Sequence, residues 1–247
     1  MLRLFAGSAL AAAVALAGAV PVAAPAVAAD RYEVDVARRA DFVPQTNFVQ
    51  CIGASLQMMI NMIEPGRDRS AREQLRLQKL ARKLSPPRRD GSIRQGASVY
   101  GWVKVLHREV DQPYRLVGAD TLNEAVKLAA RAIERTGAPV GLLVWRGRHA
   151  WVMSGFEATK DLSNGGKVTS VTIYDPLYPF GDDFWGPSPR PGVPISVRAL
   201  GRQFVPRRTN NNGNAFQTTL QQAYPTLSGK YVLVLPYLPH APVRRAA

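Results

Sequence analysis

The sequence contains one cysteine, Cys51, at a position where its thiol could act as a nucleophile. Apolar residues follow it at helical spacing up to Glu64, and Pro65 ends the pattern, so Cys51 is predicted to begin a helix. Unpaired N–H groups and the helix dipole at that end favour an anion, and the thiolate is the reactive form of cysteine. The count alone leaves two alternatives: an inert cysteine buried among apolar residues, or a catalytic nucleophile.

A thiol nucleophile needs a base, and the sequence has three histidines: His107, His149 and His240. His107 falls inside a predicted helix, and His240 lies in a proline-rich tail. His149 follows a tight Arg-Gly-Arg turn and opens an apolar strand, which would let its ring project into a cleft. The alternative is a structural histidine at a strand end, but His149 is the predicted base.

Asp175 is predicted to hold the imidazole in place. It follows the strand at 168–174 and precedes Pro176. If a turn at 164–166 pairs this strand with the one opened by His149, both residues come to the same end of an antiparallel ladder. The carboxylate could then accept the second ring N–H. Taken alone, an Asp-Pro at a strand end is more often a turn former.

Two glutamines near Cys51 could bind the oxyanion of a tetrahedral intermediate. Gln45 lies six residues before Cys51, and Gln50 lies immediately before it. A carboxamide N–H of one of them, with the backbone N–H of Cys51, would supply the two donors.

The elements that must position these residues are predicted as helices first and strands later. Ser70 with Glu73, and Thr121 with Glu124, form capping boxes at two helix starts. An α+β fold follows, in which an N-terminal helical half packs on an antiparallel β-sheet. The predicted helices are 51–64, 70–84, 98–109 and 121–137, and the predicted strands are 139–145, 149–156, 168–174 and 231–235.

Three segments around the candidate residues resemble the sequence boxes of the C39-like, papain-fold cysteine peptidases. Residues 43–56, with Gln45 six positions before Cys51, resemble the Cys box. Residues 147–156 are similar to the His box, and residues 171–176 look like the third box, which ends in Asp-Pro. The resemblance covers roughly residues 44–235. It implies a papain-like fold, a triad of Cys51, His149 and Asp175, and Gln45 in the oxyanion hole.

Ile52 departs from the pattern of that family, which usually has Gly directly after the Cys; here Gly53 comes one position later. The branched side chain could crowd the substrate, or it could mark a fold whose activity has decayed. Transporter-linked members of the family cleave leader peptides after double-glycine sites. That role does not carry over, because this sequence contains no ATPase segment.

Residues 1–29 have the pattern of a secretory signal peptide. Arg3 precedes an apolar run from residue 6 to about residue 22, and small residues occupy 26–29. An uncleaved membrane anchor is the alternative. Cleavage would leave one peptidase domain, residues 30–247, with no transmembrane segment, secreted or in the cell-wall or periplasmic space.

The formal net charge of +14 favours anionic surroundings such as cell-wall or surface polymers. No nucleic-acid motif accompanies the scattered basic residues, so nucleic acid is not an expected partner. One cysteine and three scattered histidines do not make a zinc site, and no phosphate-binding glycine loop is present. We expect neither a metal nor a cofactor.

The sequence thus predicts an exported thiol-dependent hydrolase, most simply a cysteine peptidase acting on peptide or protein substrates. Amidase chemistry or transglutaminase-type transfer are other forms of the same site. Two further hypotheses are a catalytically inactive papain-fold module that binds ligands or the cell wall, and an unrelated basic protein that binds anionic polymers.

Overall fold

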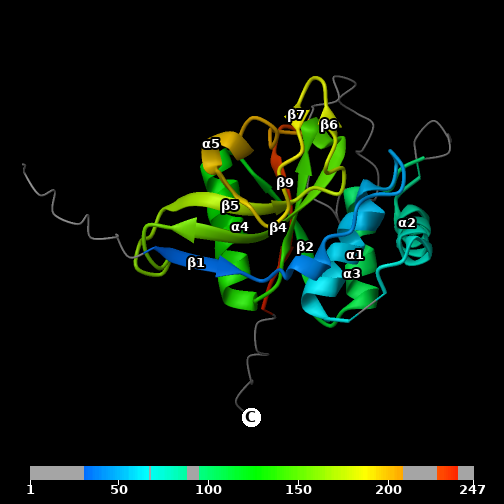
Figure 1. Ribbon diagram of the computed structural model, residues 1–247, viewed down its shortest axis with the longest axis horizontal. Coiled ribbons are helices and arrows are strands. Elements are labelled where there is room, and N and C mark those ends of the chain that lie inside the picture. The colour runs from blue at the N-terminus through cyan, green and yellow to red at the C-terminus, as the bar shows by residue number, and fades with distance from the viewer. Residues whose placement is uncertain (1–30, 67, 88–94, 208–226, 239–247) are drawn as a thin grey trace, which may run out of the picture.

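An antiparallel sheet forms the centre of the molecule in the computed structural model, which describes residues 31–66, 68–87, 95–207 and 227–238 (Figure 1). Its strands are β1 (Tyr32–Asp35), β2 (Tyr114–Ala119), β3 (Val140–Val144), β4 (His149–Ala158), β5 (Val168–Tyr174), β8 (Pro194–Ser196) and β9 (Tyr231–Pro236). The order is β2-β9-β3-β4-β5-β8, and β1 also pairs with β4. β6 (Gly181–Asp182) and β7 (Gly186–Pro187) form a separate hairpin. The predicted signal peptide and His240 lie outside the described residues.

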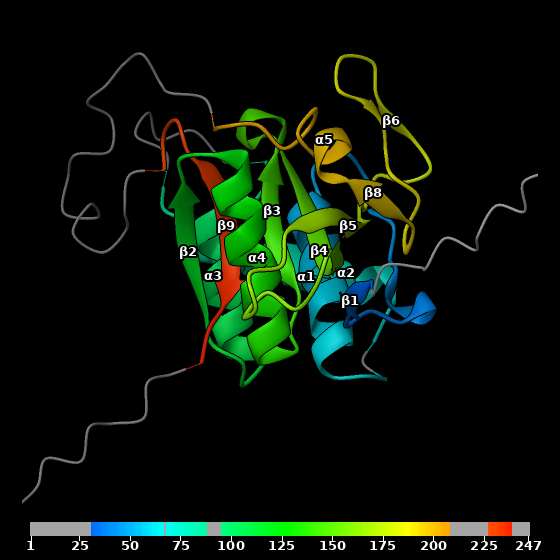
Figure 2. The ribbon, with the colours of Figure 1, turned by 90° about the vertical axis from the view of Figure 1, so that its left-hand side faces the viewer.

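Helices cover both faces of this sheet. α1 (Cys51–Ile63), α2 (Ala71–Leu84) and α3 (Val99–Glu109) lie behind it in Figure 2, and α4 (Leu122–Thr136) lies in front. The short α5 (Val197–Leu200) is on the α4 side, and two single-turn 3₁₀ helices are η1 (Arg39–Asp41) and η2 (Trp145–Gly147). The predicted α+β class, with N-terminal helices packed on an antiparallel sheet, is confirmed. Within the described ranges, no helix is both long and apolar enough to cross a bilayer.

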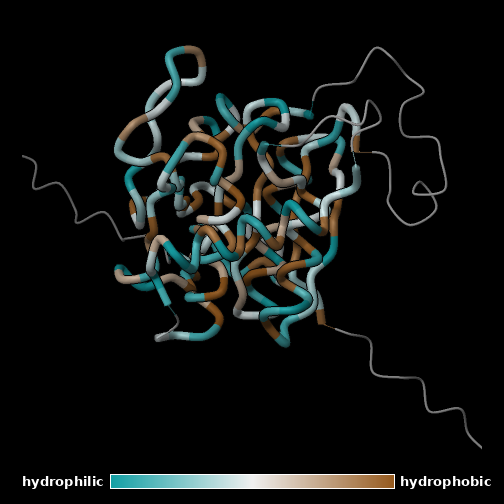
Figure 3. The backbone as a smooth tube through the Cα atoms, turned by 90° about the vertical axis from the view of Figure 1, so that its right-hand side faces the viewer, coloured by the Kyte–Doolittle hydropathy of each residue, from teal (hydrophilic) through white to brown (hydrophobic). Residues whose placement is uncertain are grey.

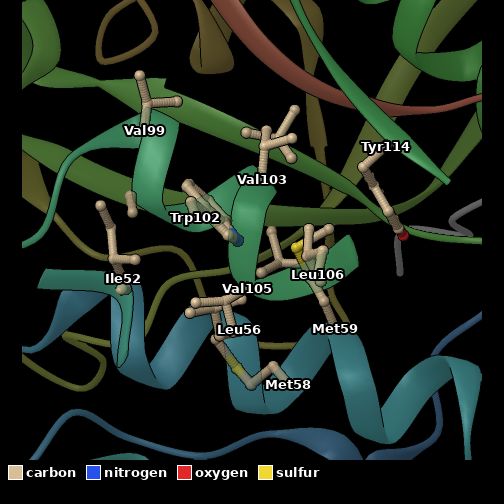
Figure 4. Close-up of a cluster of buried hydrophobic side chains, with 14 of the residues drawn as sticks. Ile52, Leu56, Met58, Met59, Val99, Trp102, Val103, Val105, Leu106 and Tyr114 are labelled. Carbon is tan, nitrogen blue, oxygen red and sulfur yellow. The ribbon is translucent and has the colours of Figure 1, made fainter. Parts of the chain in front are cut away.

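Two apolar cores account for this layering. The core between the sheet and α1–α3 is built around Trp102, Leu56 and Met59. Figure 4 shows these side chains between α1 and α3. The second core joins the apolar stripe of α4 to the other face of the sheet. Every residue of β3 is buried, so both of its faces need a covering layer. Figure 3 shows hydrophobic segments concentrated in the interior.

The predicted helix starts are confirmed, including Cys51 at the start of α1, and α1 differs from the others in its cap. Ser70 Oγ accepts from the Glu73 N–H at 3.2 Å, and Thr121 Oγ1 accepts from the Glu124 N–H at 3.1 Å. The residue before α1 is Gln50, whose side chain makes no capping hydrogen bond. The first N–H groups of α1 are therefore not satisfied by a residue of its own N-terminus.

Candidate active site

His149 and Asp175 lie together at one end of the β4–β5 ladder, as the predicted pairing of these strands requires. Val152 is paired with Tyr174, so the start of β4 lies beside the end of β5. His149 Nε2 donates to Asp175 Oδ1 at 2.7 Å, and their residues are 4% and 0% exposed. The same oxygen accepts the Leu177 backbone N–H at 2.8 Å. The turn after β5 thus fixes the carboxylate, and the carboxylate fixes the ring.

Cys51 approaches the other side of this imidazole from the first turn of α1. Its side chain is partly exposed, and its interaction with the His149 ring raises the pKa of the imidazole. One turn later, Ser55 Oγ donates to the Ala150 carbonyl oxygen at 3.2 Å, which attaches α1 to β4 beside the histidine. Since Nε2 is occupied by Asp175, Nδ1 is the ring nitrogen left for the thiol. The structure therefore brings Cys51, His149 and Asp175 together.

The surroundings of His149 favour the charged form of its imidazole. Burial is the largest influence on the pKa of His149, and it disfavours the imidazolium. Hydrogen bonds to Asp175 and Cys51, with the charges of both partners, outweigh burial and raise the pKa to about 9. His149 is therefore protonated at neutral pH and carries a proton beside the sulfur atom of Cys51.

An aromatic ring that the sequence did not single out covers the histidine. Trp145 stacks on His149 with ring centroids 4.2 Å apart and an angle of 24° between the planes. Its indole N–H donates to Gln203 Oε1 at 2.9 Å, and its backbone N–H donates to the Gln203 carbonyl oxygen at 3.0 Å. The imidazole is thus held between the Asp175 carboxylate, the Cys51 thiol and the indole face.

The turn before His149 has an unusual backbone. Trp145 and Arg146 have φ values of 55° and 56°, and Gly147 follows at 94°. Left-handed φ values in two successive non-glycine residues are costly, and they persist only where the surroundings enforce them. The two hydrogen bonds that Trp145 donates to Gln203 supply that enforcement at Trp145. This turn reverses the chain between β3 and β4 and sets the tryptophan over the ring.

Trp145→Ala is expected to lower any turnover that depends on His149 by about 10²-fold, because a small displacement of a reacting group has an effect of that size. Trp145→Phe keeps an aromatic face over His149 but loses the bond to Gln203, so it should recover most of the lost turnover. Steady-state kinetics of the three proteins measure this. Equal losses in the Ala and Phe variants would show that the indole N–H bond to Gln203, rather than the stacking, positions His149.

The two candidate glutamines lie in the loop before α1, and neither lines the cleft beside Cys51. Gln45 Nε2 donates to the Asn47 carbonyl oxygen at 2.9 Å, and its Oε1 is buried with no partner in the described part of the chain. Gln50 is buried, and its Oε1 accepts from Thr46 Oγ1 at 2.6 Å. A carboxamide has two N–H groups, so Gln45 keeps one donor beyond the bond to Asn47.

A second pair of glutamines, which the sequence analysis missed, holds this loop and α1 to α2. Gln78 accepts the Gly53 backbone N–H at 2.9 Å and donates to the Val49 carbonyl oxygen at 2.8 Å. Gln74 accepts the Thr46 N–H at 2.9 Å. A Cβ at Gly53 would lie 2.9 Å from the Gln74 carbonyl oxygen, so only glycine allows the two helices to approach this closely. Gly53 thus has a packing role of its own.

A small cleft of about 110 Å³ opens beside Cys51 and His149. Ile52 forms part of its wall, but its side chain is only 4% exposed. Figure 4 shows it projecting from α1 toward α3, on the side of Val99. Most of its bulk is therefore taken up by the core.

The other described histidine has a structural partner. His107 Nε2 contacts the backbone of Tyr114, whose N–H lies 3.2 Å away. Among the residues that the structure describes, no group of three His, Cys, Asp or Glu side chains could hold a metal ion.

The fold and this site define an α+β protein with a buried His–Asp pair facing a partly exposed thiol. No protein-family model matches the sequence, and no curated protein matches it. Among solved structures the chain is similar to UfSP from C. elegans, with a TM-score of 0.39 and 17% identity over 81% of this chain and 32% of that chain. It is also similar to a Bacillus anthracis protein described as a C39-like peptidase, with a TM-score of 0.39 and 13% identity over 78% of this chain and 93% of the other. The chain spans about a third of the length of UfSP.

Proposed function

We propose that this protein is a thiol-dependent hydrolase, a cysteine peptidase in which Cys51 is the nucleophile, His149 its acid–base partner and Asp175 the orienting group. One observation carries the proposal: a buried imidazole that is bonded to a carboxylate and interacts with a thiol at a helix start. This arrangement provides the three roles that nucleophilic catalysis by cysteine requires.

In the acylation step, the Cys51 thiolate attacks the carbonyl carbon of the peptide bond and forms a C–S bond. The carbonyl π electrons move onto oxygen, which becomes an oxyanion. His149 then gives its Nδ1 proton to the amide nitrogen as the C–N bond breaks, and the amine leaves. Asp175 keeps the ring in the orientation that presents Nδ1 to the leaving group.

The oxyanion is bound by the backbone N–H of Cys51, which the helix itself cannot satisfy because it is the first residue of α1. We assign the second donor to the remaining N–H of Gln45, with Gln50 as the alternative; either carboxamide has to turn from the loop before α1 into the cleft when substrate binds. In deacylation, neutral His149 removes a proton from water, which attacks the thioester and releases the acid. Attack by an amine in place of water would give the transglutaminase-type transfer at the same site, and hydrolysis of an amide other than a peptide bond would give the amidase reaction.

We place this activity outside the cytoplasm, since residues 1–29 have the sequence pattern of an export signal. Residues 30–247 are then one peptidase domain that acts on peptide or protein substrates. Anionic cell-wall or surface polymers are a further proposed partner on the grounds of net charge.

A catalytically inactive binding module is the second candidate. It is favoured by the carboxamide of Gln45, which is bonded to its own loop and does not line the cleft. Reactivity of the thiol separates the two candidates, because an inactive relative has no need of a thiolate.

Cys51 is expected to react with iodoacetamide at pH 6 about 10²-fold faster than an ordinary cysteine, which at its usual pKa near 8.5 is only about 0.3% thiolate at that pH. Peptide mixtures incubated with the protein should yield new termini by mass spectrometry, and prior alkylation should stop their release. Alkylation that rises only above about pH 8, with no cleavage product, would favour the inactive module.

A further inference from the structure

The cleft beside the thiol carries positive charge that nothing in its lining neutralises. Arg148 and Arg207 both line it, and its lining includes no Asp or Glu. Neither arginine forms an ion pair with a described carboxylate; the described arginines that do are Arg31 and Arg76. Two unpaired guanidinium groups in a concave site attract an anion, and their N–H forks suit a carboxylate.

The two arginines are held at the cleft by separate parts of the chain. Arg148 immediately precedes His149, and its backbone N–H donates to the Val144 carbonyl oxygen at 3.1 Å. Arg207 is held by two backbone hydrogen bonds. Its N–H donates to the Lys230 carbonyl oxygen at 2.8 Å, and its carbonyl oxygen accepts from the Gly229 N–H at 2.9 Å.

The side chain of Arg207 lies over Gly147 in the turn before the histidine. A Cβ at Gly147 would be 3.0 Å from Arg207 Cγ, so the bare glycine makes room for the aliphatic stem. The left-handed turn therefore does two things: it orients His149, and it seats a second cation beside it.

The size and the remaining lining of the cleft limit what the cation pair can bind. A cleft of about 110 Å³ is large enough for one short side chain. Ile52, Val99 and Leu143 supply an apolar part. A short aliphatic group that ends in a carboxylate matches both halves of this surface.

We propose that Arg148 and Arg207 select peptide substrates that present a carboxylate next to the scissile bond. The carboxylate belongs either to an acidic side chain or to the C-terminus of the peptide. This inference rests on the proposed peptidase function, because it names the substrate class of the same site.

A pair of small reagents tests the cation pair without any need for peptide cleavage. Iodoacetate and iodoacetamide deliver the same carbon to Cys51, but only iodoacetate carries a carboxylate. In the wild-type protein the ratio of their alkylation rates should favour iodoacetate, and added salt should reduce it. Arg148→Gln and Arg207→Gln should each lower the ratio about tenfold or more, as expected for loss of a charge-assisted hydrogen bond.

Arg146→Gln is the matched control, since Arg146 is an exposed residue of the same turn that does not line the cleft. It should leave the ratio unchanged. A wild-type ratio that equals the ratio for a free thiol, or an equal fall in all three variants, would overturn the proposal and leave only a diffuse effect of net charge.

Peptides then identify the source of the carboxylate. Four matched hexapeptides carry a single Glu or a single Gln, each with a free or an amidated C-terminus. A higher kcat/KM for Glu than for Gln assigns an acidic side chain, and a higher value for the free acid than for the amide assigns the C-terminus. If all four peptides are cleaved at one rate, the proposed carboxylate specificity is wrong while the peptidase function stands. If none is cleaved, the result counts against the peptidase function. The ratio of the two alkylation rates then still tests whether Arg148 and Arg207 bind a carboxylate.

Discussion

Cys51→Ala is expected to abolish peptide hydrolysis, lowering turnover by a factor on the order of 10⁶. The nucleophile and its base act as one unit, because the thioester cannot form without sulfur and the amine cannot leave without the imidazole proton. His149→Ala should therefore cost nearly as much, and the double variant should be little worse than either single one. Steady-state rates with one cleaved peptide measure all three.

His107→Ala is the control for this experiment, because its ring contacts the Tyr114 backbone and not the cleft. It should keep full turnover per folded molecule. Substantial hydrolysis by the Cys51 variant would show that another group does the chemistry. Losses that simply add in the double variant would show that Cys51 and His149 act independently.

The proximity of His149 and Asp175 could be predicted from sequence because both are tied to regular structure. A glycine-rich turn joins two apolar strands, and antiparallel pairing then places the start of one beside the end of the other. Cys51 is similarly tied to a helix start. The catalytic roles of these residues, and of Gln45, stay predictions.

The residues that complete the site were missed because they come from distant parts of the chain. Gln203 reaches Trp145 across 58 positions, and Arg207 meets the turn at Gly147 across 60. The left-handed backbone at Trp145 and Arg146 has no sequence signal either, since neither residue type favours it. Only tertiary contacts specify these positions.

The two edge strands of the sheet could not be predicted from the sequence for the same reason. β2 and β8 were not predicted: β2 is only partly buried and includes Gly118, and β8 has three residues and begins with Pro194. These strands form by pairing with β9 and β5, so their own residues need not alternate clearly. The helix at α4 was predicted, but not its place on the opposite face from α1–α3, because periodicity defines an apolar stripe and not the surface it meets.

Asp175→Ala is expected to damage both stability and catalysis, because one oxygen of this residue holds two groups. Removing it leaves the Nε2–H of His149 and the N–H of Leu177 without an acceptor in a buried site. The uncompensated imidazolium should cost about 3–5 kcal/mol of unfolding free energy. Without its orienting group the ring loses its catalytic position, and turnover should fall by a factor on the order of 10⁴.

The pH dependence of stability shows whether the charge on His149 causes the loss of stability in Asp175→Ala. The pKa of His149 is raised from 6.5 to about 9 in the folded protein, so its contribution is fully present below about pH 6.5 and is lost as pH rises to about 9. That contribution is roughly 3 kcal/mol. In Asp175→Ala, burial opposes the imidazolium with only Cys51 to offset it, so the variant should lose less stability over the same pH interval.

Asp175→Asn separates the hydrogen bonds from the charge. The Asn oxygen can still accept from His149 and Leu177, while its NH₂ group replaces Oδ2, which has no partner among the described residues. This variant should therefore be more stable than Asp175→Ala and keep more activity. Between pH 6.5 and 9, however, its stability should fall less than that of the wild type. Chemical denaturation at pH 6, 7.5 and 9 measures the difference. Parallel stability profiles for the wild type and both variants would mean that Asp175 holds the turn after β5 and does not hold a charged imidazole.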